Sequence, residues 1–310
     1  MPGRTHMQTA MPSSVGLWSA AYAEQLLGDL SLLDPVAALN DTCPLGSAAS
    51  YGVPLPLDRQ FVADLLGFRE VQNNVLYVNN SRGKLESMVL DLLSQLMITL
   101  SKLAQDLMLF SLPEFGYFSL PPEVCTGSSI MPQKRNPDVL ELIRAKTAAL
   151  AGAAASVKAV VSGLPSGYNR DLQETKGALI RSASTCLLSL RAMEQTVAGL
   201  EVHEEALAKG FTPEIYATDI ALGLVQDGMP FREAYREVKR RLEAGSTITQ
   251  MPDPRRVLAK RTSVGAPGNL RLEVAGQQIA RRREALKERQ DLVEHKVRSL
   301  AGSDVALFLS

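Results

Sequence analysis

Aromatic residues and cysteines are scarce in this 310-residue sequence, and neither sign of charge is in excess. Aromatic side chains account for 5% of the residues while alanine and leucine abound, a bias that favours helices over sheets. Because 33 basic residues balance 33 acidic ones, no overall electric field draws the chain to nucleic acid or to an anionic membrane. These absences predict a helical protein whose partner is a small molecule.

The three cysteines, Cys43, Cys125 and Cys186, lie far apart and form no CxxC pair. This spacing predicts neither a disulfide framework nor a cysteine-based zinc site, and it is typical of a reducing compartment. The first residues contain no apolar signal-peptide segment, and no stretch of roughly 18 residues is free of polar interruption. We therefore expect a cytoplasmic protein with neither a signal peptide nor a membrane span.

Apolar residues recur every three or four positions between Lys84 and Phe110. This spacing places them on one face and predicts a single helix over the whole segment. At 1.5 Å per residue such a helix is roughly 40 Å long, which is typical of a bundle of long helices. Further helices are expected at 14–32, at 58–66 between the cap Asp58 and the stop Gly67, and at 172–200.

Another helix should begin at Asn136 and Pro137, because Asn is a favourable N-cap and Pro fits the first helical position. Its body is rich in alanine and glycine, so neighbouring helices can approach it closely. Between residues 111 and 133 the periodicity gives way to Pro, Gly and short β-like pieces. We expect a long loop there, and loops of this length usually have a function.

The sequence as a whole predicts an all-α fold, a long-helix bundle with a smaller C-terminal helical domain. We place the bundle and its loop in residues 1–204 and the smaller domain in 205–310, where shorter helices follow one another. A densely charged last helix is expected at about 277–301. His203 and His295 are expected to be surface residues.

The loop collects two hydroxyls, a cation and a helix start within ten positions, at Ser128, Ser129, Lys134 and Asn136. The simplest interpretation is a helix cap, which is the commonest role of Ser and Asn before a helix. The loop is much longer than a cap requires, however, and a cation at a helix N-terminus is unfavourable by itself. A cation beside free backbone N–H groups forms an anion site, where a hydroxyl can exchange a proton.

The stretch GSSIMPQKRNP, residues 127–137, resembles the GSSxMPxKxNP signature of the fumarase, aspartase and argininosuccinate lyase superfamily. Within this superfamily, MPQKRNPDVLELIRAK is similar to the argininosuccinate lyase version. Further stretches at 44–59, 162–176 and 216–238 agree with the same family. The resemblance covers almost the whole chain and implies the superfamily's long-helix bundle.

The resemblance implies anti elimination of argininosuccinate to fumarate and L-arginine through a carbanion, the aci-carboxylate, without a cofactor or a metal. By motif position Ser128 would be the base that removes the proton beside a carboxylate. Lys134 and Asn136 match the residues that stabilise the carbanion charge, and Ser129 matches a substrate-binding residue. Stabilisation of developing charge is typically the largest catalytic contribution.

Thr5 and His6 match the family's Thr-His pair, in which Thr contacts substrate and a glutamate corresponding to Glu141 orients His. By themselves these residues would be read as a solvated histidine and a first-turn acid. The positions that match the substrate-binding residues for the arginine half and the carboxylates are Tyr168, Gln173 and Lys176. Without the resemblance, Gln173 and Lys176 would be read as a solvated helix face.

Members of the family assemble as homotetramers in which residues of three subunits form each active site. The resemblance therefore implies a homotetramer and a role in arginine biosynthesis. Family members also begin with a segment carrying an HTGRSRND-like substrate-binding motif, which this sequence lacks. We expect the first domain to be absent and the rate to be reduced, because each lost charge-assisted hydrogen bond is worth ~1.5–3 kcal/mol.

Two other functions remain open at this point. One is another lyase of the superfamily, of the adenylosuccinate lyase or aspartase type, against which Gln133 and the stretch YNRDLQETK argue. The other is a catalytically inactive structural helical bundle, as in the crystallin relatives. The missing first domain favours an inactive chain. An active ancestry is favoured by the retained residues, which are Ser128, Lys134, Asn136, His6 and Glu141.

Overall fold

The computed structural model describes residues 1–245 and 252–301. They divide into two compact units, which are treated separately below. Among the described residues, unit 1 comprises Met1–Glu24, Gln105–Pro137, 196–245 and 252–273. Unit 2 comprises Gln25–Ala104, Asp138–Gln195 and 274–301. The predicted boundary at 204/205 differs from this division and stays a prediction.

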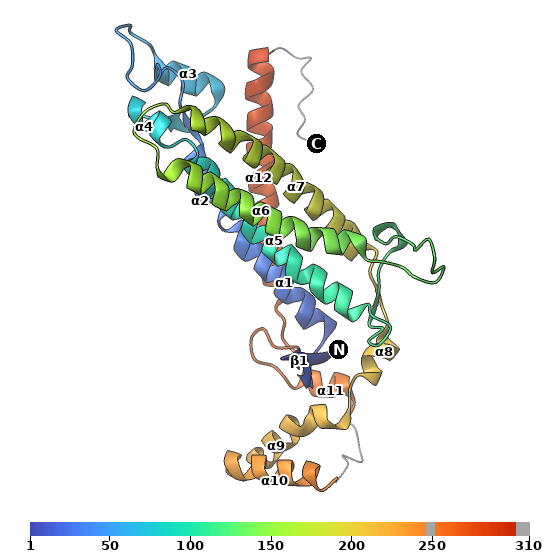
Figure 1. Ribbon diagram of the computed structural model, residues 1–310. Helices are drawn as coiled ribbons and strands as arrows, with labels where there is room; N and C mark the ends of the chain where they lie inside the picture. Colours follow the sequence, from blue (N-terminus) through green and yellow to red (C-terminus); the bar gives the residue numbers. More distant parts are fainter. Residues whose placement is uncertain (246–251, 302–310) are drawn as a thin grey trace. The chain divides into compact units, whose positions relative to one another are not determined.

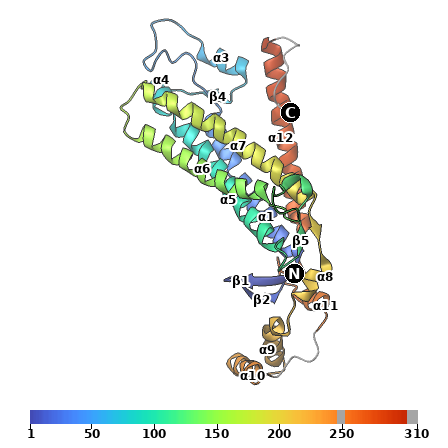
Figure 2. The ribbon, with the colours of Figure 1, turned by 45° about the vertical axis from the view of Figure 1, so that its right-hand side comes forward.

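Three long helices form the core of unit 2: α5 (Lys84–Phe110), α6 (Asp138–Ser162) and α7 (Gln173–Ala198). They lie side by side in both ribbon views (Figures 1 and 2). Ala154 and Val157 of α6 form a buried cluster with Leu90 of α5, and Leu179 of α7 packs against this cluster, so small side chains of α6 lie where the three helices meet. The predicted all-α bundle and the helix at 84–110 are confirmed.

Shorter elements complete unit 2: α2 (Leu33–Asn40), α3 (Arg59–Leu66), α4 (Val75–Asn80), and the parallel pair β3 (Thr42–Cys43) and β4 (Glu70–Val71). Asp58 accepts the Phe61 N–H at 2.8 Å, and Gly67 ends α3 with a φ of 79°, which confirms both predicted helix signals.

The charged helix α12 (Leu272–Ala301) begins five residues before the predicted start at 277. Its part in unit 2 is joined to α2 by an ion pair between Arg282 and Asp34. It is joined to α3 by a hydrogen bond from Lys296 to the Asp64 carbonyl oxygen at 3.0 Å. Residues 274–301 thus belong to unit 2.

Unit 1 is built from short elements around the ends of long ones. They are the hairpin of β1 (Pro2–Thr5) and β2 (Gln8–Pro12), part of α1 (Val15–Leu30), the pair β5 (Phe118–Ser119) and β6 (Glu201–Val202), η1 (Pro122–Val124), α8 (Glu204–Lys209), η3 (Pro213–Tyr216), α9 (Ala217–Gln226), α10 (Phe231–Glu243) and α11 (Pro254–Ala259). The expected long loop is confirmed, because β5 and η1 are the two short elements between 111 and 133.

Six of the few aromatic side chains gather in unit 1. Trp18 stacks edge-to-face on Tyr22 and Phe110, with centroid distances of 5.5 and 6.2 Å. The carboxylate of Asp106 accepts hydrogen bonds from the Trp18 indole and the Tyr22 hydroxyl, both at 2.8 Å. The cluster also contains Phe115, Tyr117 and Phe118. Burial, followed by the bonded Asp106 carboxylate, raises the pKa of Tyr22 well above its ordinary value.

The predicted cap at Asn136 is wrong. Helix α6 begins at Asp138, and Asn136 instead forms an isolated antiparallel bridge with Thr126. The prediction that His203 is a plain surface residue is also wrong, because it is half-buried and its Nε2 lies 2.6 Å from the Ser119 hydroxyl. His295 is exposed, as predicted.

Among the described residues, α5 has the length and apolar composition of a membrane-crossing helix. Half of its most apolar window is buried inside the structure, and the core helix of a soluble bundle has the same composition. The expectation that the chain has no membrane partner stays a prediction.

Candidate active site

The loop that carries the signature is closed at its base. The backbone of Thr126 and Asn136 exchanges two hydrogen bonds of 2.9 and 2.8 Å, and the Asn136 amide donates to the Gly127 carbonyl oxygen at 3.2 Å. The Lys134 N–H donates to the Met131 carbonyl at 3.0 Å, which folds the loop back on itself. Residues 127–135 therefore form a compact loop whose two ends are held together by Asn136.

Ser128 is half-buried, and its hydroxyl oxygen is hydrogen-bonded to the backbone of its own loop. Its Oγ accepts hydrogen bonds from the N–H groups of Ile130 at 3.3 Å and Met131 at 3.1 Å. Hydrogen bonds donated to an oxygen favour its negatively charged form. The loop thus provides two donors to the hydroxyl that must hold negative charge if it is to remove a proton.

Lys134 and Ser129 lie on the same loop and are exposed. Among the described residues, no carboxylate lies within ion-pair distance of Lys134. A cation without a carboxylate partner is available to an anionic ligand. The loop thus carries a cation and two hydroxyls on one short segment.

Thr5 and His6 lie at the turn of the β1–β2 hairpin, where Thr5 pairs with Gln8. The two turn residues, His6 and Met7, have φ angles of 51° and 65°, a left-handed backbone that non-glycine residues rarely adopt. The Arg4 guanidinium donates to the Met7 carbonyl oxygen at 3.2 Å and lies 4.7 Å from the Phe115 ring centroid. The exposed imidazole of His6 is therefore presented on a strained turn that Arg4 supports.

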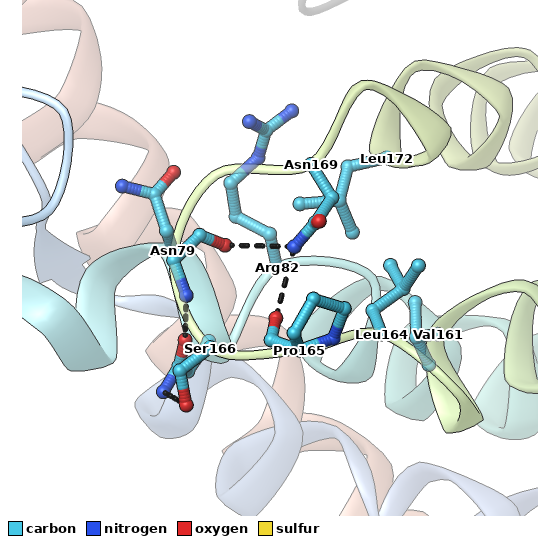
Figure 3. A pocket seen from close by; sticks show the side chains of 10 residues that line it. Asn79, Arg82, Val161, Leu164, Pro165, Ser166, Asn169 and Leu172 are labelled. Atoms are coloured by element: carbon cyan, nitrogen blue, oxygen red, sulfur yellow. Dashed lines mark hydrogen bonds between the residues drawn. The ribbon is translucent and has the colours of Figure 1, made fainter.

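In unit 2 the three predicted substrate residues form one hydrogen-bonded chain. Lys176 Nζ donates to Gln173 Oε1 at 2.9 Å, and Gln173 Nε2 donates to the Tyr168 hydroxyl at 3.1 Å. All three side chains are exposed, and a cavity of about 220 Å³ lies beside Tyr168. Figure 3 shows part of its lining, which consists of Asn79, Asn80, Arg82, Val161, Leu164, Pro165, Ser166, Gly167, Asn169 and Leu172.

The candidate residues belong to both units. Thr5, His6 and the signature loop are in unit 1, whereas Glu141, on the first turn of α6, and the Tyr168 chain are in unit 2. Within the described part of unit 1, no hydrogen bond or ion pair joins His6 to Ser128 or Lys134. The orientation of His6 by Glu141 stays a prediction.

Among the residues that the structure describes, no group of three or more His, Cys, Asp or Glu side chains could hold a metal ion. The sequence interpretation missed Asn80 and Arg82, which contact the loop around Tyr168. A signal was present, because the helix ends with Asn79 and Asn80 and an arginine and a glycine follow at positions 82 and 83, but these residue types have many structural roles.

Comparisons with known proteins agree with the geometry. Residues 1–152 match the family model described as "Lyase". The argininosuccinate lyase of Sorangium cellulosum (strain So ce56) is 46% identical over 283 residues, which cover 91% of this chain and 64% of that protein. The argininosuccinate lyase of Xylella fastidiosa (strain Temecula1 / ATCC 700964) is 42% identical over 273 residues, covering 88% of this chain and 60% of that protein.

The chain is therefore similar to argininosuccinate lyases over most of its length. The fold is that of a solved lyase structure, since the crystal structure of EDDS lyase in complex with formate superposes with a TM-score of 0.84. That match covers 97% of this chain and 67% of the other at 23% identity, so it bears on the fold alone. The chain spans 64% and 60% of the lengths of the two curated argininosuccinate lyases.

Proposed function

We propose that the chain is an argininosuccinate lyase that splits argininosuccinate into fumarate and L-arginine by anti β-elimination. The observation that carries the proposal is the closed loop around Ser128, in a chain 46% identical to an argininosuccinate lyase. Two backbone donors favour negative charge on the Ser128 oxygen. Lys134 lies on the same loop and has no carboxylate partner among the described residues.

In the proposed reaction Ser128 takes the proton from the carbon beside a substrate carboxylate. The electron pair moves into that carboxylate to form the aci-carboxylate, and the C–N bond then breaks and releases arginine. Lys134 stabilises the additional negative charge, an interaction that strengthens as the charge develops. Asn136 holds the loop closed, and of its two amide N–H groups one donates to the Gly127 carbonyl oxygen while the other has no partner among the described residues and is kept for the substrate.

The remaining predicted residues bind and orient the substrate in this proposal. Thr5 and Ser129 contact it, and His6, oriented by Glu141, takes part in proton transfer. Tyr168, Gln173 and Lys176 bind the arginine half and the carboxylates. The reaction needs neither a metal nor a cofactor, and the protein would act in arginine biosynthesis in the cytoplasm.

We also propose a homotetramer in which several subunits form each site. The candidate side chains other than Ser128 and Asn136 are exposed in the single chain, where a ligand would be left largely in water. Helix α7 exposes large apolar side chains, with Ile180, Leu187 and Leu188 between 50% and 66% accessible. Apolar exposure along a helix is typical of an association surface.

The test is fumarate release from argininosuccinate, followed by ultraviolet absorbance. We expect release by the unaltered chain and a fall of about 10²-fold or more with Ser128→Ala, because proton abstraction loses its base. Ser19→Ala is the matched control, since that exposed α1 hydroxyl bonds only its own helix at Gly16 and should leave the rate unchanged.

Equal rates for Ser128→Ala and the unaltered chain would contradict the assignment of the base. A folded, helical chain that releases no fumarate would contradict the proposed activity and favour a structural helical bundle. Release from adenylosuccinate or aspartate in place of argininosuccinate would change the substrate while retaining the elimination.

A further inference from the structure

Asn80, at the end of α4, holds the loop at 163–169 that carries Tyr168. The Gly167 N–H donates to Asn80 Oδ1 at 2.7 Å, and Asn80 Nδ2 donates to the Ser166 hydroxyl at 3.3 Å. Gly167 has a φ of 98° and is buried. One asparagine side chain thus binds the two residues immediately before Tyr168.

The residue before Asn80 makes a buried hydrogen bond of its own. The Asn79 amide donates to the Ser50 hydroxyl at 2.8 Å, and both residues are buried. Ser50 has a φ of 91° and follows Ala48 and Ala49 at 48° and 53°, so three successive non-glycine residues have left-handed backbone. Backbone strain of this kind persists where the surrounding structure fixes it, and it is common at functional sites.

Arg82 fixes the ring of Tyr168. Its guanidinium carbon lies 5.6 Å from the ring centroid, within the range of a cation–π contact. Figure 3 shows Arg82 among the residues that line the neighbouring cavity. Within the described residues, Arg82 is half-buried and has no ion pair with a carboxylate, so the aromatic ring is its recorded partner.

The hydrogen-bonded chain through Gln173 has a defined direction. The Lys176 ammonium can only donate, so it faces the amide oxygen of Gln173, and the amide nitrogen then faces Tyr168. The Tyr168 oxygen therefore accepts this bond, and its own O–H proton is left for an acceptor. A carboxylate oxygen can accept a hydrogen bond from this O–H group, whereas a guanidinium has no acceptor atom.

We propose that Asn80 and Arg82 are positioning residues that hold Tyr168 so that its hydroxyl donates a hydrogen bond to a substrate carboxylate. The inference rests on the proposed function and deepens it, because it assigns Tyr168 to a carboxylate and not to the guanidinium of the arginine half.

The first test needs no catalysis. Hydrogen exchange of the Gly167 N–H, followed by mass spectrometry or NMR on the full chain, should be at least about tenfold faster in Asn80→Leu, because the amide loses its acceptor. Asn80→Asp retains an acceptor oxygen and should keep the slow exchange. Equal exchange in the unaltered chain and in Asn80→Leu would overturn the role of Asn80.

The second test separates positioning from general stability. Arg82→Leu and Tyr168→Phe should each raise the KM for argininosuccinate and the inhibition constant of succinate by about tenfold or more, while kcat changes less than about twofold. Arg82→Lys keeps a cation over the ring and should restore most of the affinity. Arg69→Leu is the matched control, because Arg69 is an exposed arginine paired with the adjacent Glu70.

A fall in kcat without a change in KM, or no rescue by Arg82→Lys, would overturn the role of Arg82. Succinate binding that is unaffected by Tyr168→Phe, or absent from a chain that releases fumarate, would overturn the carboxylate assignment. A chain that releases no fumarate but exchanges Gly167 as expected and binds succinate through Tyr168 would contradict the proposed function alone.

Discussion

At the scale of single residues, the β1–β2 turn beside the predicted site residue His6 contains a strained backbone at Met7. Met7 is 65% exposed and has a φ of 65°, so replacing it with glycine removes strain and no buried contact. We expect Met7→Gly to raise the free energy of unfolding by about 1 kcal/mol. Chemical denaturation measures this change.

Met11→Gly is the control for this substitution. Met11 lies on β2 of the same hairpin, is 49% exposed and has no left-handed backbone, so glycine should lower stability there by about 0.5–1 kcal/mol. The same sign for both substitutions would contradict the strain argument.

Cys186 on α7 gives a prediction about pH. Burial raises the pKa of its thiol from an ordinary value near 9 to about 11, so at pH 8 the thiolate fraction falls from roughly one tenth to one thousandth. We expect iodoacetamide to alkylate Cys186 at least about a hundredfold more slowly in the folded than in the unfolded chain. Peptide mass spectrometry measures the alkylation rate of Cys186, and the rate of the half-buried loop residue Cys125 in the same sample is the internal comparison.

The sign of the associated stability change follows. The unfolded chain releases the thiol proton first, so the contribution of Cys186 is complete below about pH 9 and is lost as the pH rises towards about 11. Rapid alkylation of Cys186 in the folded chain at pH 8 would contradict both statements.

Single residues also limited what the sequence could predict. The motif located Ser128 and Lys134, but the N–H donors to Ser128 depend on loop geometry that no pattern encodes. His203 was assigned to the surface because polar neighbours surround it in the sequence. Its contact with Ser119 arises from the pairing of β5 with β6, two strands far apart along the chain.

At the scale of elements, the close approach of α6 to its neighbours depends on small side chains. Ala154 is 4% exposed and packs with Leu90 and Val157, so a larger residue must displace them. We expect Ala154→Leu to lower the free energy of unfolding by about 1–3 kcal/mol in a denaturation experiment. Ala21→Leu on α1 is the control, because Ala21 is exposed and the substitution should be nearly neutral; a neutral Ala154→Leu would indicate unfilled space at this contact.

Long periodic helices could be predicted from sequence, and short irregular elements could not. The stripe from Lys84 to Phe110 gave the bounds of α5, because 27 residues of regular spacing outweigh local preferences. The cap at Asn136 was misplaced because Asn also pairs well in a backbone bridge, and only the fold of the loop decides between the two. The β1–β2 hairpin was missed since its turn is His6–Met7 and lacks the usual Asn-Gly signal.

At the scale of the whole molecule, the proposed assembly makes a prediction about mass. Light scattering should give a particle four times the mass of the 33.6 kDa chain. Leu188→Asp should reduce that mass, because Leu188 is 64% exposed on α7 and a carboxylate would be buried without a partner in the assembly. Leu222→Asp on α9, where the side chain is 46% exposed, is the control. An unaltered chain that is monomeric would contradict the proposed tetramer.

The aromatic cluster of unit 1 has an optical consequence. The sequence contains one tryptophan, and Trp18 lies in that cluster with its indole bonded to Asp106. Tryptophan fluorescence from each chain therefore reports on this unit, whereas far-ultraviolet circular dichroism is dominated by the long helices. Recording both signals during denaturation would reveal whether the two units unfold in a single transition or one after the other.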